Sequence, residues 1–267
     1  ANVMSKLEDY LQTEWPELDV FLTSVTDHYA TASVCGPNAK KIINKIFKDL
    51  DLSDESFPHM SFKEVKLGNI NCRVMRISFT GELSYEINVE ASYGKYIWEK
   101  CIEAGKEFNI TPYGTETMHL LRAEKGYIIV GQDTDGSITP LVLGLDWRFG
   151  KSKKDFLGKR SLIRSDTVRK DRKQLVGILP TNKNEKLEEG QHIILDKEIK
   201  TPTPMLGHIT SCYQSPTLGH NFALAVIKNG QSLIGTKAFA STPELKTIEV
   251  EIVEPIFYDK ENTKLAS

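Results

Sequence analysis

A glutamate follows directly after a glycine that interrupts a strand-like stretch of the sequence. The tripeptide Thr80-Gly81-Glu82 breaks a pattern of alternating apolar and polar residues that resumes at Tyr85. A carboxylate at such a break can project from a sheet edge into a cleft, where its two oxygens accept parallel N–H bonds from a planar heterocycle. The alternative is a solvated glutamate in a turn, and the residue types alone favour that alternative.

An arginine lies in a predicted helix that is otherwise rich in apolar residues. Arg122 falls within the helix predicted over 116–125, which a threonine precedes and a glycine ends. Its guanidinium could bind a carboxylate of a ligand, or it could pair structurally with Glu124 or Asp133. The sequence leaves both possibilities open.

Patterns typical of metal sites are missing from the sequence. The loop 131–136 is rich in carboxylates, but a calcium loop needs a glutamate six residues after its glycine, where Val142 stands. The 6 histidines and 4 cysteines are scattered without ligand spacing, so we expect no metal site. Widely separated cysteines in apolar stretches favour reduced thiols and a cytoplasmic protein.

Composition and motifs exclude several classes of function. The 34 Lys+Arg against 36 Asp+Glu give a net charge of −2, which does not support binding to nucleic acid or to an anionic membrane. Apolar runs such as 222–227 are far shorter than the roughly 18–20 residues of a membrane span. The sequence also lacks the glycine-rich fingerprint of a dinucleotide fold, the P-loop and the nucleophile elbow.

The first part of the chain alternates between helix-like and strand-like segments, which predicts an α+β fold. The predicted helices are 3–11, 37–50, 92–104 and 116–125, and the predicted strands are 19–22, 29–34, 62–67, 72–79 and 85–89. The apolar run 141–149 is expected to be buried.

Lysine and arginine cluster over 150–173, as in a solvated linker helix or an anion-binding surface. Beyond this cluster no helical period is found. The short strand-like runs are spaced as in a small antiparallel barrel or sandwich, and they are 175–179, 192–195, 207–210, 222–227, 237–240 and 247–253.

Five motifs together resemble the glycine-cleavage aminomethyltransferase (T-protein) superfamily. In family order they are FTGELSYEI at 79–87, PYGTETMHLLRAEKG at 112–126, GQDTDGSITP at 131–140, DFLGKRSL at 155–162 and GHITSCYQSPTLG at 207–219. Within the superfamily the chain is most similar to the C-terminal region of the alpha subunit of heterotetrameric sarcosine oxidases, through YLQTEWP at 10–16, residues 115–126 and KQLVG at 173–177. The resemblance spans essentially the whole chain.

The resemblance implies a T-protein-like folate-binding α+β domain over 1–170, followed by a C-terminal antiparallel β-barrel domain over 171–267. It also implies that an N-terminal part is missing. Family members carry upstream a Gly-Gly-hydrophobic-x-Asp-Asp-like motif, whose aspartate is regarded as the key residue near the folate nitrogens, and the sequence contains no such motif. The catalytic residue is therefore unassigned, and flavin and NAD are expected only in absent regions or in partner subunits.

The ligand implied by the resemblance is tetrahydrofolate, which would take a one-carbon unit from an oxidised N-methyl amine and become 5,10-methylenetetrahydrofolate. Glu82 becomes the bidentate acceptor for the amino-pyrimidine edge of the pterin. Arg122 is expected at an anionic part of the ligand or as a residue that orients the site. Tyr85 and Tyr258 are expected in its wall, although packed core tyrosines would explain both equally well.

Two other functions remain open: a glycine cleavage system aminomethyltransferase, and a non-catalytic folate-binding module. The chain departs from many T-proteins at Ser84, where they have glycine, and at Val130, where they often have tyrosine. The expected partners are folate and other sarcosine oxidase-like subunits, without nucleic acid or membrane.

Overall fold

The structure, a computed structural model, describes residues 2–149, 152–199 and 202–266. Its contacts divide the chain into two units. The first contains the residues up to 78 together with 82–112, and the second contains 79–81 together with 113–265. The chain therefore enters the second unit for the segment 79–81 and returns to the first at Glu82.

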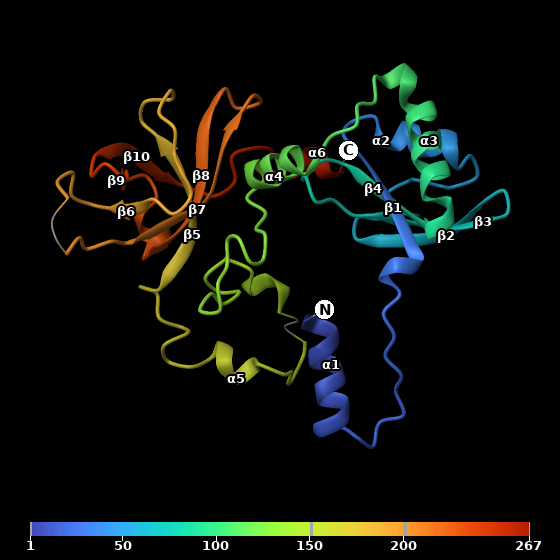
Figure 1. The fold of residues 1–267 in the computed structure, drawn as a ribbon, viewed down its shortest axis with the longest axis horizontal. Coiled ribbons are helices and arrows are strands. Elements are labelled where there is room, and N and C mark those ends of the chain that lie inside the picture. The colour runs from blue at the N-terminus through green and yellow to red at the C-terminus, as the bar shows by residue number, and fades with distance from the viewer. Residues whose placement is uncertain (1, 150–151, 200–201, 267) are drawn as a thin grey trace. The chain divides into compact units, whose positions relative to one another are not determined.

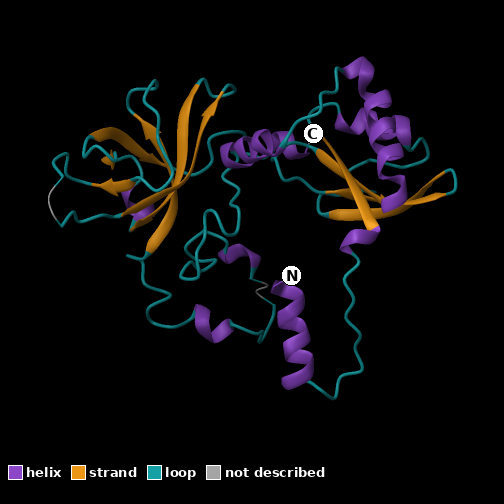
Figure 2. Ribbon diagram, viewed as in Figure 1, coloured by secondary structure: helices purple, strands orange, loops and turns teal. Residues whose placement is uncertain are grey.

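A four-stranded antiparallel sheet forms the first unit (Figure 1), with the strand order β1-β4-β3-β2. Its strands are β1 (Tyr29–Cys35), β2 (Ser61–Leu67), β3 (Ile70–Arg76) and β4 (Ser84–Glu90). Two helices, α2 (Ala39–Ile46) and α3 (Gly94–Gly105), pack on one face of this sheet (Figure 2). Short 3₁₀ turns are η1 (Thr26–His28), η2 (Ala91–Tyr93) and η3 (Lys106–Phe108).

Alternation along the strands decides which face of this sheet is covered. In β3 and β4 the apolar side chains of Val74, Ile87 and Val89 are almost fully buried against the helices. The intervening residues, such as Arg73 and Asn88, are polar and lie on the opposite face. This period of two is the pattern expected for a sheet with one buried face.

The N-terminal segment differs from expectation. Helix α1 (Asn2–Thr13) forms as predicted, yet it buries none of its side chains. The predicted strand 19–22 is not a strand, and Phe21 within it is 92% exposed. Strand-like residues form a strand only when a neighbouring strand accepts their backbone hydrogen bonds, and here none of the described strands pairs with them.

The second unit contains a closed antiparallel barrel with the strand order β10-β5-β8-β7-β6-β9 (Figure 1). Its strands are β5 (Lys173–Pro180), β6 (His192–Ile194), β7 (Gly207–Ser215), β8 (His220–Lys228), β9 (Lys237–Ser241) and β10 (Thr247–Val253). Strand β8 is buried nearly throughout, because one side of it faces the barrel interior and the other faces a cluster containing Ala123 and Val142. The barrel follows from the six short apolar runs that the sequence spaces with turn residues.

Helix α4 (Thr115–Glu124) and the long connection that follows belong with the barrel. The connection contains η4 (Asp146–Arg148) and α5 (Lys159–Leu162), while η5 (Gly230–Leu233) and α6 (Thr263–Ala266) lie further along. The predicted division at residues 170 and 171 falls just before β5, whereas the contacts group α4 with the barrel. Within the run 141–149, Val142 is buried as expected, but Trp147 is 62% exposed.

Among the described residues, no helix has the length and apolar character needed to cross a membrane.

None of the four cysteines, all of which are described, forms a disulfide, and burial raises the pKa of the Cys101 and Cys212 thiols to about 11. Both groups are therefore protonated at neutral pH.

Gly207 in β7 tests the tightness of the barrel. A Cβ added there would lie 1.9 Å from the carbonyl oxygen of Val226 on β8, and backbone atoms cannot yield without breaking the ladder. Gly207→Ala should lower the free energy of unfolding by about 1–3 kcal/mol in urea denaturation. Gly136→Ala is the matched control, because its Cβ would meet no atom within 4 Å. Equal midpoints for the two variants would contradict the tight packing.

Candidate functional site

The turn Thr80-Gly81-Glu82 is built around a glycine that no other residue could replace without strain. Gly81 has φ +84°, and a Cβ there would lie 2.5 Å from Cγ of Lys125. The backbone of the turn thus rests directly on the aliphatic stem of that lysine. This contact explains the sequence pattern, since the turn needs both the left-handed conformation and the absent side chain.

Two polar side-chain groups of this turn have no hydrogen-bond partner among the described residues. The half-buried Glu82 carboxylate makes no hydrogen bond or ion pair with any described residue. The Thr80 hydroxyl is buried and also lacks a partner among them. A buried polar atom without a hydrogen-bond partner costs free energy, and such atoms are rare in folded proteins.

Lys125, which supports the turn, ends in a buried ion pair. Its side chain is 2% exposed, and its ammonium group lies 2.8 Å from a carboxylate oxygen of Asp259, whose side chain is 4% exposed. The ammonium also donates to the backbone carbonyl of Asp259. Opposite charges buried together in this way compensate each other's desolvation.

Asp259 is in turn fixed by the start of α6. One carboxylate oxygen accepts hydrogen bonds from the backbone N–H and the hydroxyl of Thr263, and the other accepts one from the N–H of Lys264. Burial alone would raise the pKa of Asp259, but the hydrogen bonds from Lys125 and Thr263 outweigh burial and lower it to about 2. The carboxylate therefore stays charged at neutral pH.

Arg122 takes the structural alternative that the sequence left open. Its side chain is fully buried, and Nη1 of the guanidinium lies 2.5 Å from Oδ2 of the equally buried Asp133. The guanidinium also donates to the hydroxyl groups of Ser211 and Tyr213 and to the carbonyl of Tyr127. Its Nε has no partner among the described residues.

Asp133 is saturated by the same network. Its carboxylate accepts hydrogen bonds from the hydroxyl groups of Thr210 and Ser211 and from the N–H of Ile129, in addition to Arg122. Every oxygen of this buried carboxylate is therefore occupied by protein. Such an arrangement suits a structural centre that ties α4 to β7.

Tyr258 is held through its backbone at the C-terminal end of α4. The carbonyl of Glu124 accepts hydrogen bonds from the N–H groups of Phe257 and Tyr258, at 2.9 and 3.0 Å. The Glu124 carboxylate, also buried, accepts one from the Ser215 hydroxyl. Arg122, Tyr258 and the support of the Gly81 turn thus converge on one helix.

Tyr85 lies elsewhere, in the core of the first unit. It projects from β4 onto the helix-covered face and packs against Phe57, with ring centroids 5.9 Å apart. Burial raises the pKa of its hydroxyl, which finds no partner among the described residues. The core packing that the sequence offered as an alternative to a wall of the site accounts for this tyrosine.

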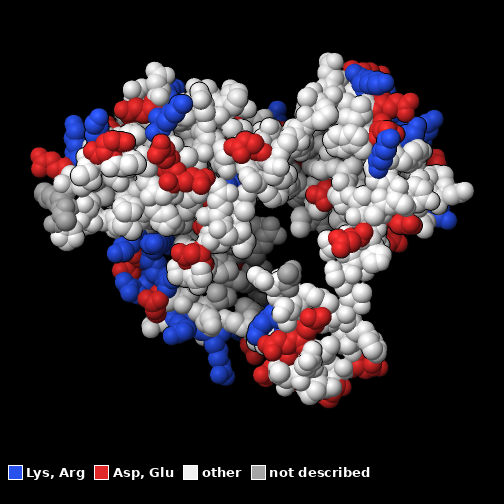
Figure 3. Space-filling model, viewed as in Figure 1, with Lys and Arg blue, Asp and Glu red and all other residues white. Residues whose placement is uncertain are grey.

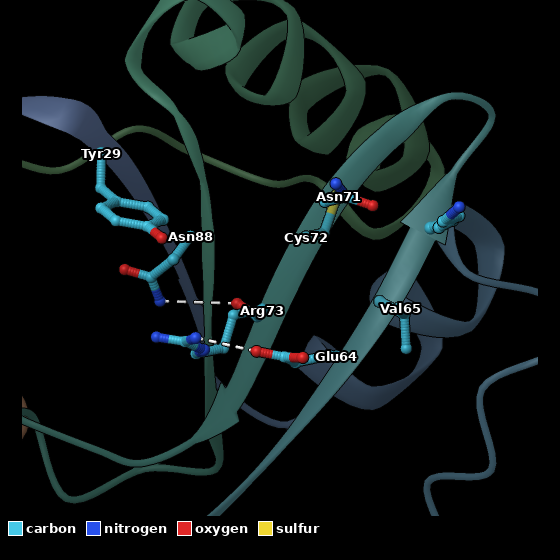
Figure 4. Close-up of a pocket in the computed structure, with 8 residues that line it drawn as sticks. Tyr29, Glu64, Val65, Asn71, Cys72, Arg73 and Asn88 are labelled. Atoms are coloured by element: carbon cyan, nitrogen blue, oxygen red, sulfur yellow. Dashed lines mark hydrogen bonds and ion pairs between the residues drawn. The ribbon is translucent and has the colours of Figure 1, made fainter.

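A separate hollow of about 500 Å³ lies over the open face of the sheet (Figure 4). Tyr29, Glu64, Arg73 and Asn88 line part of it, and an ion pair of 2.8 Å joins Arg73 to Glu64. Asn88 donates to the backbone carbonyl of Arg73. Arg73, Glu64 and Asn88 are thus linked to one another, and none of the four predicted site residues lines this hollow.

Two arginines of the basic segment form ion pairs with aspartates of the same segment. Arg169 pairs with Asp171, and Arg172 pairs with Asp166. Lysine and arginine side chains accordingly lie among aspartates and glutamates on the face in view (Figure 3). No group of three potential metal ligands is found in the described residues.

Sequence analysis missed the Lys125–Asp259 pair. Lysine is usually exposed, and its partner lies 134 residues away in the sequence, so no local pattern connects them. The available signal was the position of Lys125, immediately before Gly126 at the end of a helix that is rich in apolar residues.

Comparison with known proteins agrees with this architecture. Residues 1–153 match the family described as the GCVT N-terminal domain, and residues 173–259 match the glycine cleavage T-protein C-terminal barrel domain. The chain belongs to the GCVT family. The α+β domain followed by an antiparallel barrel, predicted from sequence, is thereby confirmed.

Two kinds of relative are similar to this GCVT chain. It is 48% identical to the sarcosine oxidase subunit alpha of Corynebacterium sp. (strain P-1), over 99% of this chain and 27% of that protein. It is 31% identical to an aminomethyltransferase of Thermoanaerobacter sp. (strain X514), over 92% of this chain and 64% of that protein. The chain thus spans about a quarter of the first relative and under two thirds of the second.

A solved structure supports the fold. The crystal structure of glycine cleavage system aminomethyltransferase T from Bartonella henselae matches with a TM-score of 0.72 at 18% identity, over 95% of this chain and 66% of that chain. At this identity the likeness concerns the fold alone.

The Arg122–Asp133 pair should dominate the stability of the second unit. Arg122→Met leaves a buried carboxylate without its counter-charge, so the free energy of unfolding should fall by about 3–5 kcal/mol. Arg169→Met removes an exposed ion pair and should leave the denaturation midpoint close to that of the parent chain. Urea denaturation of both variants provides the measurement, and similar losses would refute the structural role of Arg122.

Asp259 should make the protein sensitive to acid in a defined window. Its pKa is about 2 in the folded chain against an ordinary value of 3.8, so the folded state holds its proton less tightly. The resulting stability is complete above pH about 4 and is lost as the pH falls to about 2. Asp259→Asn should flatten the fall in unfolding free energy across this window. Acid titrations followed by circular dichroism would reveal it, and parallel curves would oppose it.

Proposed function

We propose that this chain is the tetrahydrofolate-binding module of a sarcosine oxidase alpha-subunit-like protein. In that role it binds tetrahydrofolate, which accepts a one-carbon unit from an oxidised N-methyl amine and leaves as 5,10-methylenetetrahydrofolate. Oxidation of the amine takes place outside this module, with other subunits of such an oxidase as partners.

The observation that carries the proposal is the uncommitted polar edge of the Thr80-Gly81-Glu82 turn. Glu82 offers two acceptor oxygens to the paired N–H groups of an amino-pyrimidine ring, and the buried Thr80 hydroxyl lacks a partner. Gly81, whose backbone packs on the stem of Lys125, fixes the turn from which both groups project. These features fit a flat, polar-edged ligand such as a pterin.

The residues proposed for the site position the folate and form no covalent bond with it. Bound folate supplies the nucleophilic amine nitrogen that captures the one-carbon unit. Glu82 would hold the pterin edge through charge-assisted hydrogen bonds, which fixes the orientation of the ring. Arg122 would act indirectly, because its pair with Asp133 fixes the position of α4. Tyr258 would form part of the wall of the folate site. No residue of this chain is assigned as catalytic.

Sequence similarity favours the sarcosine oxidase assignment over the glycine cleavage alternative. The identity is 48% to the sarcosine oxidase subunit and 31% to the aminomethyltransferase.

Calorimetric titration of tetrahydrofolate tests the proposal. Glu82→Ala should weaken binding by about 2–5 kcal/mol, because one side of a charge-assisted pair is lost. Glu90→Ala, at the exposed end of β4, should bind like the parent chain. No binding by the parent chain, or equal affinity after Glu82→Ala, would overturn the proposed site.

A further inference from the structure

We propose that Lys125 and Asp259 form a positioning pair that sets the Thr80-Gly81-Glu82 turn, although neither side chain contacts the ligand. The inference rests on the proposed folate site, because the turn matters for function only if Glu82 binds the pterin. Its physical basis is a chain of contacts within the second unit, which runs from α6 through Asp259 and Lys125 to Gly81.

The first step is the contact between Gly81 and the lysine stem. An added Cβ at Gly81 would lie 2.5 and 2.8 Å from Cγ and Cδ of Lys125, so the turn and the stem are packed as closely as atoms allow. Any change in the rotamer of the lysine would therefore open a gap under the turn or push its backbone away. Glu82 is the next residue along the chain, so its Cα moves with the turn.

The second step is the anchor that fixes the rotamer. A lysine stem is flexible and loses conformational entropy when it is held in one rotamer. The Asp259 carboxylate, 2.8 Å from the ammonium, holds it there, and Thr263 and Lys264 hold the carboxylate. Because Asp259 accepts bonds from both Lys125 and α6, one pair connects the start of that helix to the floor of the turn.

The third step is the burial of the pair. Side chains that are 2% and 4% exposed exchange little with water, so the anchor does not open and close as a surface ion pair does. An ion pair with a stabilising role alone would not require Gly81 to pack against the lysine stem. The direct packing of Gly81 on the stem distinguishes a positioning role from stabilisation alone.

Hydrogen exchange measured by mass spectrometry tests the pair without any ligand. Lys125→Met keeps most of the stem and removes its anchor, so amides of 79–84 should exchange faster while the barrel strands remain protected. The double variant Lys125→Met/Asp259→Asn avoids leaving a buried unpaired charge and should show the same local change. Lys237→Met, which removes the exposed Lys237–Glu249 pair of the barrel, is the matched control. Unchanged exchange at 79–84 in both Lys125 variants would overturn the proposal.

Tetrahydrofolate titration then links the pair to Glu82. Lys125→Met/Asp259→Asn should weaken binding by about tenfold in the parent chain and cause no further loss in the Glu82→Ala background. An equal loss in both backgrounds would mean a purely structural effect and would overturn the positioning role. If Glu82→Ala itself binds as the parent does, the proposed function fails instead, while the exchange result still decides whether the pair sets the turn.

Discussion

The second unit depends on the burial of opposite charges around α4. Arg122, Glu124 and Lys125 are at most 3% exposed, although each has an ionisable side chain that water would solvate far better than protein. Such burial is tolerated where the buried groups meet partners inside the protein. Asp133 and Asp259 supply the opposite charges for Arg122 and Lys125, and the Ser215 hydroxyl donates a hydrogen bond to the Glu124 carboxyl group.

Near-consecutive charges can all be buried because a helix turns by about 100° per residue. The three side chains leave α4 in different directions and reach different segments. Arg122 reaches β7 and the loop that follows the helix, Glu124 reaches the end of β7, and Lys125 reaches the segment before α6. The helix is therefore located by polar contacts with three parts of the chain, and apolar packing by Ala123 fills the space between them.

Local patterns in the sequence predicted most of the elements. Alternation located the hairpin of β2 and β3, and the Thr115 and Gly126 boundaries located α4 to within about two residues. The predicted strand 19–22 failed because its β-forming residues lack a partner strand, which no local pattern reveals. For the site, the sequence identified Gly81 as a break but could not find Lys125 beneath it. It also left Arg122 undecided, because a guanidinium that binds a ligand and one that binds Asp133 look the same in one dimension.

The sequence separation of Lys125 and Asp259 affects folding during translation. The two residues are separated by 134 positions, so α4 leaves the ribosome long before the carboxylate that neutralises its lysine has been synthesised. At about 5–20 residues per second, that delay is roughly 7 to 27 s. During this interval Lys125 of the nascent helix must stay in water, and its stem is not yet held in place under the Gly81 turn. Synonymous codons that slow translation between β5 and α6 would therefore prolong the exposure of a half-built unit to chaperones and proteases.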